Sequence, residues 1–375
     1  MNKCLVDPRS LLEYDFGSHH PFKIYRLGLT YDLIAAYDLV DADDVTILRP
    51  RLATDEEALQ FHSKGYLETL RLASSGMWVP NLFSHGLGTS DNPVFPDVFD
   101  WAMQVAGASI DCALSLLNGQ ADRAFNLAGG LHHAMPSRAS GFCHINDAAL
   151  AIATLVAAGK RVAYVDIDAH HGDGVQHAFY RNGDVLTVSV HQTGYTIFPG
   201  SGFVEETGEN AGEGYAINVP LQPGAGDAAY ERAFERIVIP ALKAFAPDVL
   251  VTQLGADAIL GDIVANLRMS LVQFERCVKQ FRALGLPWLA LGGGGYAVEN
   301  VVRAWTLAWG IQMDRDLPDA LPAAWLARTA PYGMNISRLR GSGEATPTSA
   351  DAAEDLERTI EILEQRVLPI LSGVR

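Results

Sequence analysis

The fold class is decided by the stretch Tyr164-Val165-Asp166-Ile167-Asp168-Ala169-His170-His171-Gly172-Asp173-Gly174. An apolar run, Val162 to Val165, leads into three aspartates and two adjacent histidines within residues 166–173. Glycines follow at once and indicate a turn. The pattern is typical of a buried strand that ends in a site. Carboxylates and imidazoles together predict that this site binds a metal ion.

Outward from this stretch, predicted strands and helices alternate along the chain. The strands are apolar without a two-residue alternation, as expected when helices cover both faces of a sheet. This order predicts an α/β fold with a mostly parallel sheet, in which ligands bind beyond the carboxyl ends of the strands. We expect strands near 4–6, 124–128, 161–167, 185–190, 248–253 and 287–291, and helices near 26–37, 54–61, 64–75, 98–118, 145–158, 173–181, 227–245, 270–284, 298–311 and 351–371.

Three segments between these elements carry local signals. Thr54, followed by three acidic residues, predicts a capped helix start. Residues 76–96 are rich in Gly, Pro, Asn and Ser and predict a long irregular loop, which is often functional. Residues 341–350 predict a mobile linker before a docked amphipathic helix at 351–371. We expect one domain over residues 1–375.

The composition excludes several classes of protein. A net charge of −16 argues against a nucleic-acid-binding face, although it would attract a cationic substrate. No run approaches the roughly 20 apolar residues of a membrane span, and no signal peptide is visible. The four cysteines are scattered and form no CxxC pair, which favours a reducing compartment. We therefore expect a cytoplasmic protein.

Asp168 and His170 form the first candidate site. Residues two apart project to the same side of an extended strand end, where they can share a metal ion. Asp257 is the candidate third ligand, because it also follows an apolar strand and has the small neighbours Gly255 and Ala256. Two carboxylates and one neutral histidine balance a divalent cation. Each aspartate taken alone would also suit the start of a helix.

A tandem histidine pair, His132-His133, follows Gly129-Gly130 after a predicted strand. Imidazole titrates near neutrality, so such a pair can supply a general base and an electrostatic partner beside a metal. Asp166 and Asp173 bracket the metal ligands, and a carboxylate that binds one ring nitrogen fixes the tautomer of a histidine. The two histidines can thus form two His–Asp pairs, although Asp173 also suits a helix cap.

Four glycines, Gly292 to Gly295, precede Tyr296. The loop lacks the Lys-Ser/Thr of a phosphate-binding loop and the GxGxxG of a dinucleotide site. A phenol at its end could donate to a carbonyl or to an oxyanion that forms there. Phe142 and Phe198 lie in Gly-containing loops, where they could line a narrow channel or serve ordinary core packing.

Together these motifs resemble the zinc-dependent histone deacetylase family, in its class I branch and closest to the bacterial acetoin-utilisation deacetylases. The resemblance runs from about residue 20 to residue 309. The motifs that carry it keep the family's order and approximate spacing. They are His20-Pro21, Asp91-Asn92-Pro93, Gly129–Ala134, Ser140–Cys143, Asp166–Gly174, Phe198-Pro199-Gly200, Gly255–Asp257 and Gly292–Tyr296.

The resemblance implies the single-domain arginase/deacetylase fold, with a sheet of about eight strands. It implies that Asp168, His170 and Asp257 bind zinc. It makes His133 the general base and acid, and His132 its electrostatic neighbour. The remaining roles that it implies are the following: Asp166 pairs with His132, Asp173 pairs with His133, and Tyr296 polarises the substrate carbonyl.

The resemblance also implies how the substrate binds. It assigns Gly141, Phe142 and Phe198 to an acyl-lysine tunnel, with Gly294 as a further substrate-binding residue. Asp91 becomes a rim carboxylate that holds the substrate backbone, and Arg26 lies near an acetate-release channel. The family often binds a structural potassium ion at the positions of Asp166, Asp168, His170 and Ser189.

The implied activity is the removal of acetyl or other acyl groups from lysine side chains of a protein or peptide. The runner-up is an acetylpolyamine amidohydrolase acting on small acetylated amines, whose members carry Pro-Gly-His-His where this chain has Gly130-Leu131-His132-His133. A binuclear manganese ureohydrolase would need further aspartates, and a non-catalytic binding protein should have lost a ligand or the tyrosine. Ile197 and Val264 leave the acyl length open. Iron(II) would suit the same ligands, and the oligomeric state is not readable.

Overall fold

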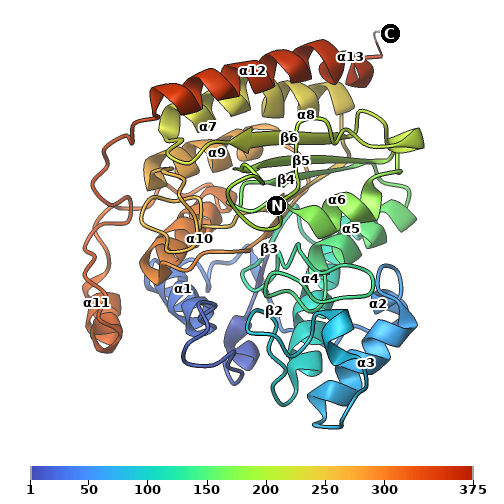
Figure 1. Cartoon of the computed structure of the whole chain (residues 1–375). Coiled ribbons are helices and arrows are strands. Elements are labelled where there is room, and N and C mark those ends of the chain that lie inside the picture. The colour runs from blue at the N-terminus through green and yellow to red at the C-terminus, as the bar shows by residue number, and fades with distance from the viewer. Residues whose placement is uncertain (1, 374–375) are drawn as a thin grey trace.

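The computed structural model describes residues 2–373 and contains one sheet of eight parallel strands flanked by helices (Figure 1). The strand order is β2-β1-β3-β8-β7-β4-β5-β6, and every pairing is parallel. The predicted α/β fold is therefore confirmed. The strands are β1 (Lys3–Val6), β2 (Val45–Leu48), β3 (Arg123–Asn126), β4 (Val162–Asp166), β5 (Val185–Gln192), β6 (Ala216–Leu221), β7 (Val249–Gln253) and β8 (Trp288–Leu291).

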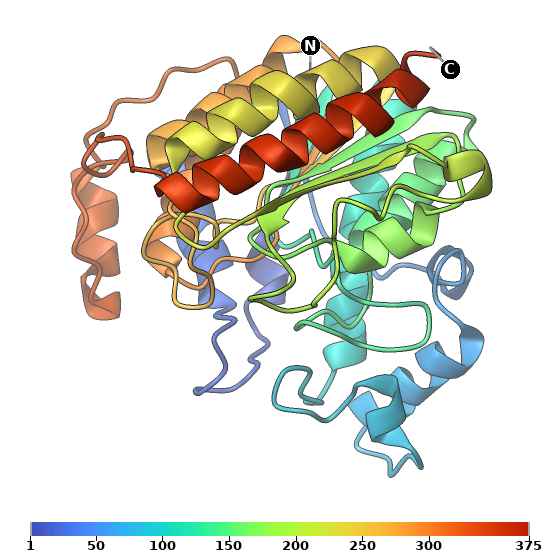
Figure 2. The ribbon, with the colours of Figure 1, turned by 45° about the horizontal axis from the view of Figure 1, so that its top comes forward.

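Helices cover both faces of this sheet, which explains why its strands are apolar throughout. On β4, Val162 and Tyr164 enter one core, whereas Ala163 and Val165 enter the other. In Figures 1 and 2, α7, α8 and α12 lie on one side of the sheet and α4, α5 and α6 on the other. The helices are α1 (Tyr25–Ala36), α2 (Asp55–Ala58), α3 (Lys64–Ser74), α4 (Val98–Leu117), α5 (Asp147–Ala157), α6 (Asp173–Phe179), α7 (Asp227–Ala233), α8 (Ile239–Phe245), α9 (Leu271–Ala283), α10 (Val298–Gln312), α11 (Ala323–Thr329), α12 (Ala350–Arg366) and α13 (Leu368–Leu371).

A local signal places the start of α2 correctly. Thr54 caps α2 and forms a reciprocal capping box with Glu57. The helix itself is shorter than predicted and ends at Ala58. Residues 76–96 are irregular apart from one 3₁₀ turn, Leu82–His85.

Three elements, β2, β6 and α11, have no counterpart among the predicted ones. The strands β2 and β6 are the two edges of the sheet. Pro220 lies in β6, and proline is tolerated at an edge because no neighbour needs its missing N–H. The predicted helix over 227–245 is confirmed as a continuous helical segment, in which a π-helical turn, Phe234–Val238, lies between α7 and α8. Pro240 follows at the start of α8 and cannot donate a helical hydrogen bond.

The C-terminal segment lies against the sheet side that carries α7. Thr346 donates from its hydroxyl to Asp227 at 2.9 Å, so residues 341–349 contact α7 without forming a regular element. The predicted helix at 351–371 divides into α12 and α13, since Pro369 lacks an N–H to continue the helix. Arg232 and Glu357 join α7 to α12 through an ion pair of 2.6 Å. Among residues 2–373, no helix combines the length and the apolar composition of a membrane span.

Candidate active site

The predicted site residues converge beyond the carboxyl ends of four neighbouring strands. His132 and His133 follow β3, Tyr296 follows β8, Asp257 follows β7, and Asp168 follows β4. These strands are adjacent and parallel in the centre of the sheet. Their carboxyl ends therefore open on one edge, where α/β sheets bind ligands.

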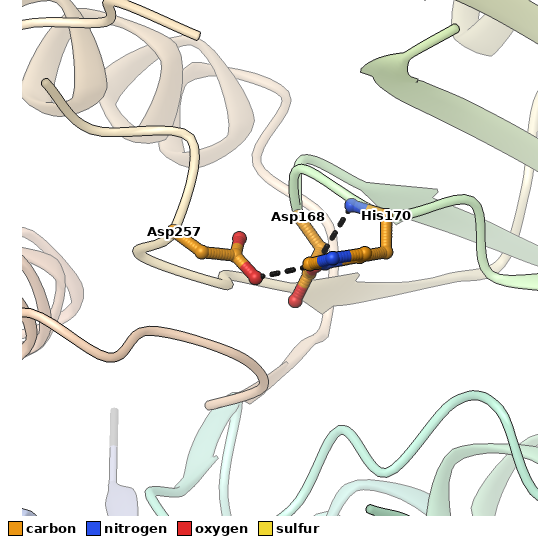
Figure 3. Close-up of side chains that lie close together, drawn as sticks. All are labelled: Asp168, His170 and Asp257. Carbon is orange, nitrogen blue, oxygen red and sulfur yellow. Dashed lines mark hydrogen bonds and ion pairs between the residues drawn. The ribbon is translucent and has the colours of Figure 1, made fainter. Parts of the chain in front are cut away.

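Asp168, His170 and Asp257 meet in a buried cluster (Figure 3). His170 Nδ1 lies 3.1 Å from Asp168 Oδ1 and 3.0 Å from Asp257 Oδ2. One ligand atom from each residue lies within 4.8 Å of the others. The three atoms can therefore share one metal ion, and they leave room for further ligands.

The outer oxygens of both carboxylates are bound by the protein. Asp168 Oδ2 accepts hydrogen bonds from Gln253 Nε2 at 2.7 Å and from the Gly294 N–H at 2.8 Å. Asp257 Oδ1 accepts from the Ala169 N–H at 2.7 Å. Asp257 is thus fixed by one oxygen and presents the other to the cluster, while Asp168 Oδ1 also accepts from the His170 N–H at 3.0 Å, as expected of oriented metal ligands.

The electrostatics of the cluster fit a divalent cation. Burial raises the pKa of Asp257 to about 7, and the charge of Asp168 contributes. Burial opposes the ionisation of Asp168, but the charge of His132 and the hydrogen bond from His170 hold its pKa well below the usual value. Burial lowers the pKa of His170, yet the two carboxylates outweigh it and raise this pKa to about 10. A side chain on Gly255 would collide with Asp168. Glycine at this position therefore lets the backbone after β7 lie close to the Asp168 carboxylate. A divalent ion would replace the proton on His170 and balance both carboxylates.

Each histidine of the tandem pair binds its own aspartate. His132 Nδ1 lies 2.7 Å from Asp166 Oδ2, and His133 Nδ1 lies 2.7 Å from Asp173 Oδ1. The two Nε2 atoms are 3.0 Å apart. Asp166 Oδ2 also accepts from the buried Tyr164 hydroxyl at 2.6 Å.

The two histidines have opposite charge preferences. Burial lowers the pKa of His132, but the carboxylates of Asp166 and Asp168 outweigh it and raise the pKa to about 9. Burial and the charge of His132 lower the pKa of His133 to about 4, although Asp173 acts in the other direction. At neutral pH the pair therefore holds one cation and one neutral base. Such a split is typical of acid–base sites.

Asn146 and Asp147, which the sequence did not single out, hold the loop that carries both histidines. Asp147 accepts from the N–H groups of Gly130 and Leu131 at 3.0 and 2.8 Å. Asn146 donates from Nδ2 to the His132 carbonyl at 3.2 Å and to the Ala134 carbonyl of the same loop at 3.0 Å. Both lie at the start of α5, where Asn146 also caps the helix. An asparagine before a helix is a recognisable cap in the sequence. The sequence does not show that the Asn146 side chain also reaches the loop that carries His132 and His133.

Tyr296 lines the same small cavity as His132, His133 and Asp168. Burial raises the pKa of its phenol well above the usual value, and the charges of Asp257 and Asp168 act in the same direction. The phenol therefore stays protonated and can donate a hydrogen bond. Its backbone N–H donates to Asp262 Oδ2 at 2.7 Å. Asp262 is a second residue that the sequence did not single out.

Arg26 lies beneath the glycine loop and is fully buried. It donates to the carbonyls of Gly295 and Gly293 at 2.5 and 2.7 Å. Burial lowers its pKa to about 10. In this structure Arg26 holds the loop before Tyr296.

The predicted tunnel residues lie on the outer side of the histidines. A side chain on Gly141 would collide with His133 and Phe198. The Phe198 ring lies 4.9 Å from the His133 ring, and the Phe142 ring lies 5.6 Å from the Tyr296 ring. The two phenylalanines therefore flank an approach to the cavity.

Asp91 and Ser189 lie farther from the cluster. Asp91 is exposed on the loop before α4, and its backbone carbonyl lies 3.2 Å from His20 Nε2. Ser189 pairs with Asp166 across β5 and β4, and its hydroxyl lies 2.8 Å from His191 Nδ1. The rim role of Asp91 and the potassium site stay predictions.

Comparison with known proteins identifies the family. The histone deacetylase domain family matches residues 20–311. Histone deacetylase 9 of Arabidopsis thaliana is 43% identical over 310 residues, which cover 82% of this chain and 72% of the plant protein. Histone deacetylase 1 of Homo sapiens is 38% identical over 312 residues, which cover 82% of this chain and 64% of the human protein.

Solved structures extend the similarity to nearly the whole fold. A crystal structure of an HDAC homologue complexed with SAHA has a TM-score of 0.87 and 32% identity, and the match covers 96% of this chain and 99% of the homologue. An HDAC homologue from Aquifex aeolicus has a TM-score of 0.86 and 31% identity, with 96% and 100% covered. The family is generally metal-dependent, in agreement with the buried Asp–His–Asp cluster. The matched residues include every candidate metal ligand and both histidines, and they support a deacetylase activity. The chain therefore belongs to the histone deacetylase family.

Proposed function

We propose that this protein is a zinc-dependent amidohydrolase that removes acetyl or other acyl groups from lysine side chains of a protein or peptide and releases acetate or the matching acid. One observation carries the proposal. His132 and His133 lie Nε2 to Nε2, 3.0 Å apart, beside the Asp168–His170–Asp257 cluster. This arrangement supplies a base, a positive charge and a metal site in one cavity.

Asp168, His170 and Asp257 would hold the zinc ion. When bound, zinc supplies Lewis acidity toward an amide carbonyl and lowers the pKa of a water molecule. The donor set would also accept iron(II). A structural potassium ion at Asp166, Asp168, His170 and Ser189 belongs to the same proposal.

His133, Tyr296 and His132 each have a separate role in the proton transfers and in stabilising charge. His133 Nε2 takes the proton of the attacking water, and Asp173 stabilises the imidazolium that results. Tyr296 donates its phenol proton in a hydrogen bond to the substrate oxygen as negative charge develops there. His133 then protonates the leaving amine, while His132 stays cationic and stabilises the negative charge nearby.

The surroundings of the cavity favour a lysine side chain as substrate. Phe142 and Phe198 flank its approach and would contact an aliphatic chain. The sequence before the histidines, Gly130-Leu131, differs from the Pro-Gly of acetylpolyamine amidohydrolases. Asp91 would then hold the substrate backbone. If the chain is of the bacterial acetoin-utilisation type that its motifs resemble, its substrate is an acylated metabolic enzyme rather than a histone.

A substrate panel tests the proposal. The zinc-loaded protein is assayed with acetyl-lysine peptides, with longer acyl-lysine peptides and with acetylated polyamines. We expect the peptides to have the higher kcat/KM. Hydrolysis of acetylated polyamines without hydrolysis of any peptide would favour the small-amine activity. No hydrolysis of either class would indicate a binding protein.

A further inference from the structure

Tyr296 follows a run of glycines, which have no side chains to anchor the backbone that carries the phenol. Gly293 and Gly295 have φ angles of 112° and 130°, a conformation that favours glycine. Arg26 holds this loop from below by donating to the carbonyls of both residues. These two bonds end at Gly295, so they do not fix the peptide group that leads into Tyr296.

Asp262 makes the contact at Tyr296. Its Oδ2 accepts hydrogen bonds from the N–H groups of Tyr296 and Ala297, at 2.7 and 3.0 Å. Ala297 is the residue before α10 and has no side-chain oxygen that could cap the helix. The Asp262 carboxylate, which comes from another loop, therefore binds the two N–H groups that lead into α10. The dipole of the helix favours a negative charge at this end.

The other oxygen of Asp262 fixes the carboxylate within its own turn. Asp262 Oδ1 accepts from the Val264 N–H at 2.9 Å, as an aspartate in a tight turn often does. A further bond joins this turn to α10, because Asn300 donates from Nδ2 to the Leu260 carbonyl at 3.1 Å. Asp262 is half-buried although both of its chain neighbours are exposed. The turn thus directs this one side chain inward.

The segment that carries Asp262 also carries a metal ligand. Asp257 lies five residues before Asp262, and the Ala256 N–H donates to the Gly294 carbonyl at 2.9 Å. The segment therefore contacts the glycine loop near its start and the Tyr296 backbone near its end. In the proposed reaction, the Tyr296 phenol and a metal held by Asp257 act on the same carbonyl oxygen. Their relative placement depends on this one segment.

We propose that Asp262 is a positioning residue, which holds the Tyr296 backbone so that the phenol is directed at the carbonyl oxygen of the substrate. This inference rests on the proposed amidohydrolase function, in which Tyr296 donates to that oxygen. Of the residues that the structure describes, those lining the small catalytic cavity include Tyr296 but not Asp262. Asp262 therefore acts through Tyr296 and not on the substrate.

A double-mutant cycle tests the inference. The zinc-loaded wild type, Asp262→Ala, Tyr296→Phe and the double variant are compared on the acylated amine that the wild type hydrolyses fastest. We expect Asp262→Ala to reduce kcat by roughly tenfold or more, because a small displacement of a catalytic group is costly. In the Tyr296→Phe background the same substitution should change kcat by less than about twofold, since the phenol that Asp262 positions is absent. KM and the zinc content per chain should stay unchanged in Asp262→Ala.

The cycle separates failure of this inference from failure of the proposed function. Equal losses of kcat in both backgrounds would show that Asp262 acts through something other than the phenol, and would overturn the inference. An unchanged kcat in Asp262→Ala, or loss of zinc from this variant, would overturn it too while the proposed function stands. A wild-type protein that hydrolyses no acylated amine would contradict the proposed function, and the inference with it.

Two further variants complete the test. Asp248→Ala removes a carboxylate that likewise accepts from a backbone N–H, that of Arg161 at 2.9 Å, but at the amino ends of the strands. This control should leave kcat unchanged. Asp262→Asn keeps one side-chain oxygen and replaces the other with an N–H donor, so it should lower kcat only where Tyr296 is present. If the unfolding temperature shows that Asp262→Ala does not fold, the cycle is completed with Asp262→Asn, and the same outcomes decide it.

Discussion

His132 and His133 face each other through their Nε2 atoms, 3.0 Å apart, while their Nδ1 atoms bind two different aspartates. The arrangement lets two chemically identical rings differ in charge. His132 lies near Asp166 and Asp168 and stays cationic up to about pH 9. That charge helps to keep the neighbouring His133 neutral down to about pH 4. His132 therefore helps to set the protonation state of His133.

Two substitutions should move the acidic limb of the pH–rate profile in opposite directions. Activity requires neutral His133, so kcat/KM should rise with pH through the pKa of this residue. His132→Asn removes the neighbouring cation and should raise that pKa, which moves the limb to higher pH. Asp173→Asn removes the carboxylate that favours the imidazolium and should move the limb to lower pH. The measurement is kcat/KM against pH for both variants. Shifts of the same sign in both would contradict the assignment of His133 as base.

Tyr296→Phe should reduce kcat by roughly 10²-fold or more, because one donor to the developing oxyanion is lost. The metal content should stay unchanged, since Tyr296 is not a ligand. Tyr332→Phe is a matched control on an exposed ring and should leave kcat unchanged. Near-normal turnover in Tyr296→Phe would remove the phenol from the mechanism.

Asp257→Ala should abolish both metal binding and turnover. It leaves Asp168 and His170 as the remaining ligands and removes the carboxylate that Ala169 orients. Bound metal is measured per protein chain by elemental analysis after dialysis against zinc. Asp351→Ala, on an exposed residue of α12, should retain the full metal content. An unaltered metal content in Asp257→Ala would refute this ligand set.

Asn146→Ser should separate helix capping from positioning of the histidines. Serine retains a side-chain oxygen that can cap α5, but it lacks the Nδ2 donor to the His132 and Ala134 carbonyls. We expect kcat to fall by roughly tenfold or more, because a small displacement of a base is costly. KM and metal content should change little. Asn146→Asp also keeps a capping oxygen and should show the same loss. If kcat is normal in both variants, the loop is held by other contacts.

The sequence alone determined the class of fold and the residues of the centre. The continuous apolar runs around Tyr164 and Val249 predict buried parallel strands, because such runs suit a sheet covered on both faces. Polar residues directly after those runs predict one shared edge. Asp168, His170 and Asp257 could be named together for this reason, although 87 residues separate His170 from Asp257. The edge strands β2 and β6 were not predicted: β2 is only partly buried, and the proline within β6 weakens its strand signal.

Only the tertiary structure decided how the centre is held and charged. The resemblance implies which aspartate binds which histidine, but the contacts themselves depend on how β3, β4 and α6 pack, as the 2.7 Å contact of His132 with Asp166 shows. Asp147 accepts a hydrogen bond from the Leu131 N–H, and Asp262 accepts one from the Tyr296 N–H. In the sequence, Asp147 and Asp262 look like ordinary cap and turn residues. The pKa values follow from burial and from charges that lie far apart in the chain but close together in the fold. Local sequence does not specify the distances between those charges.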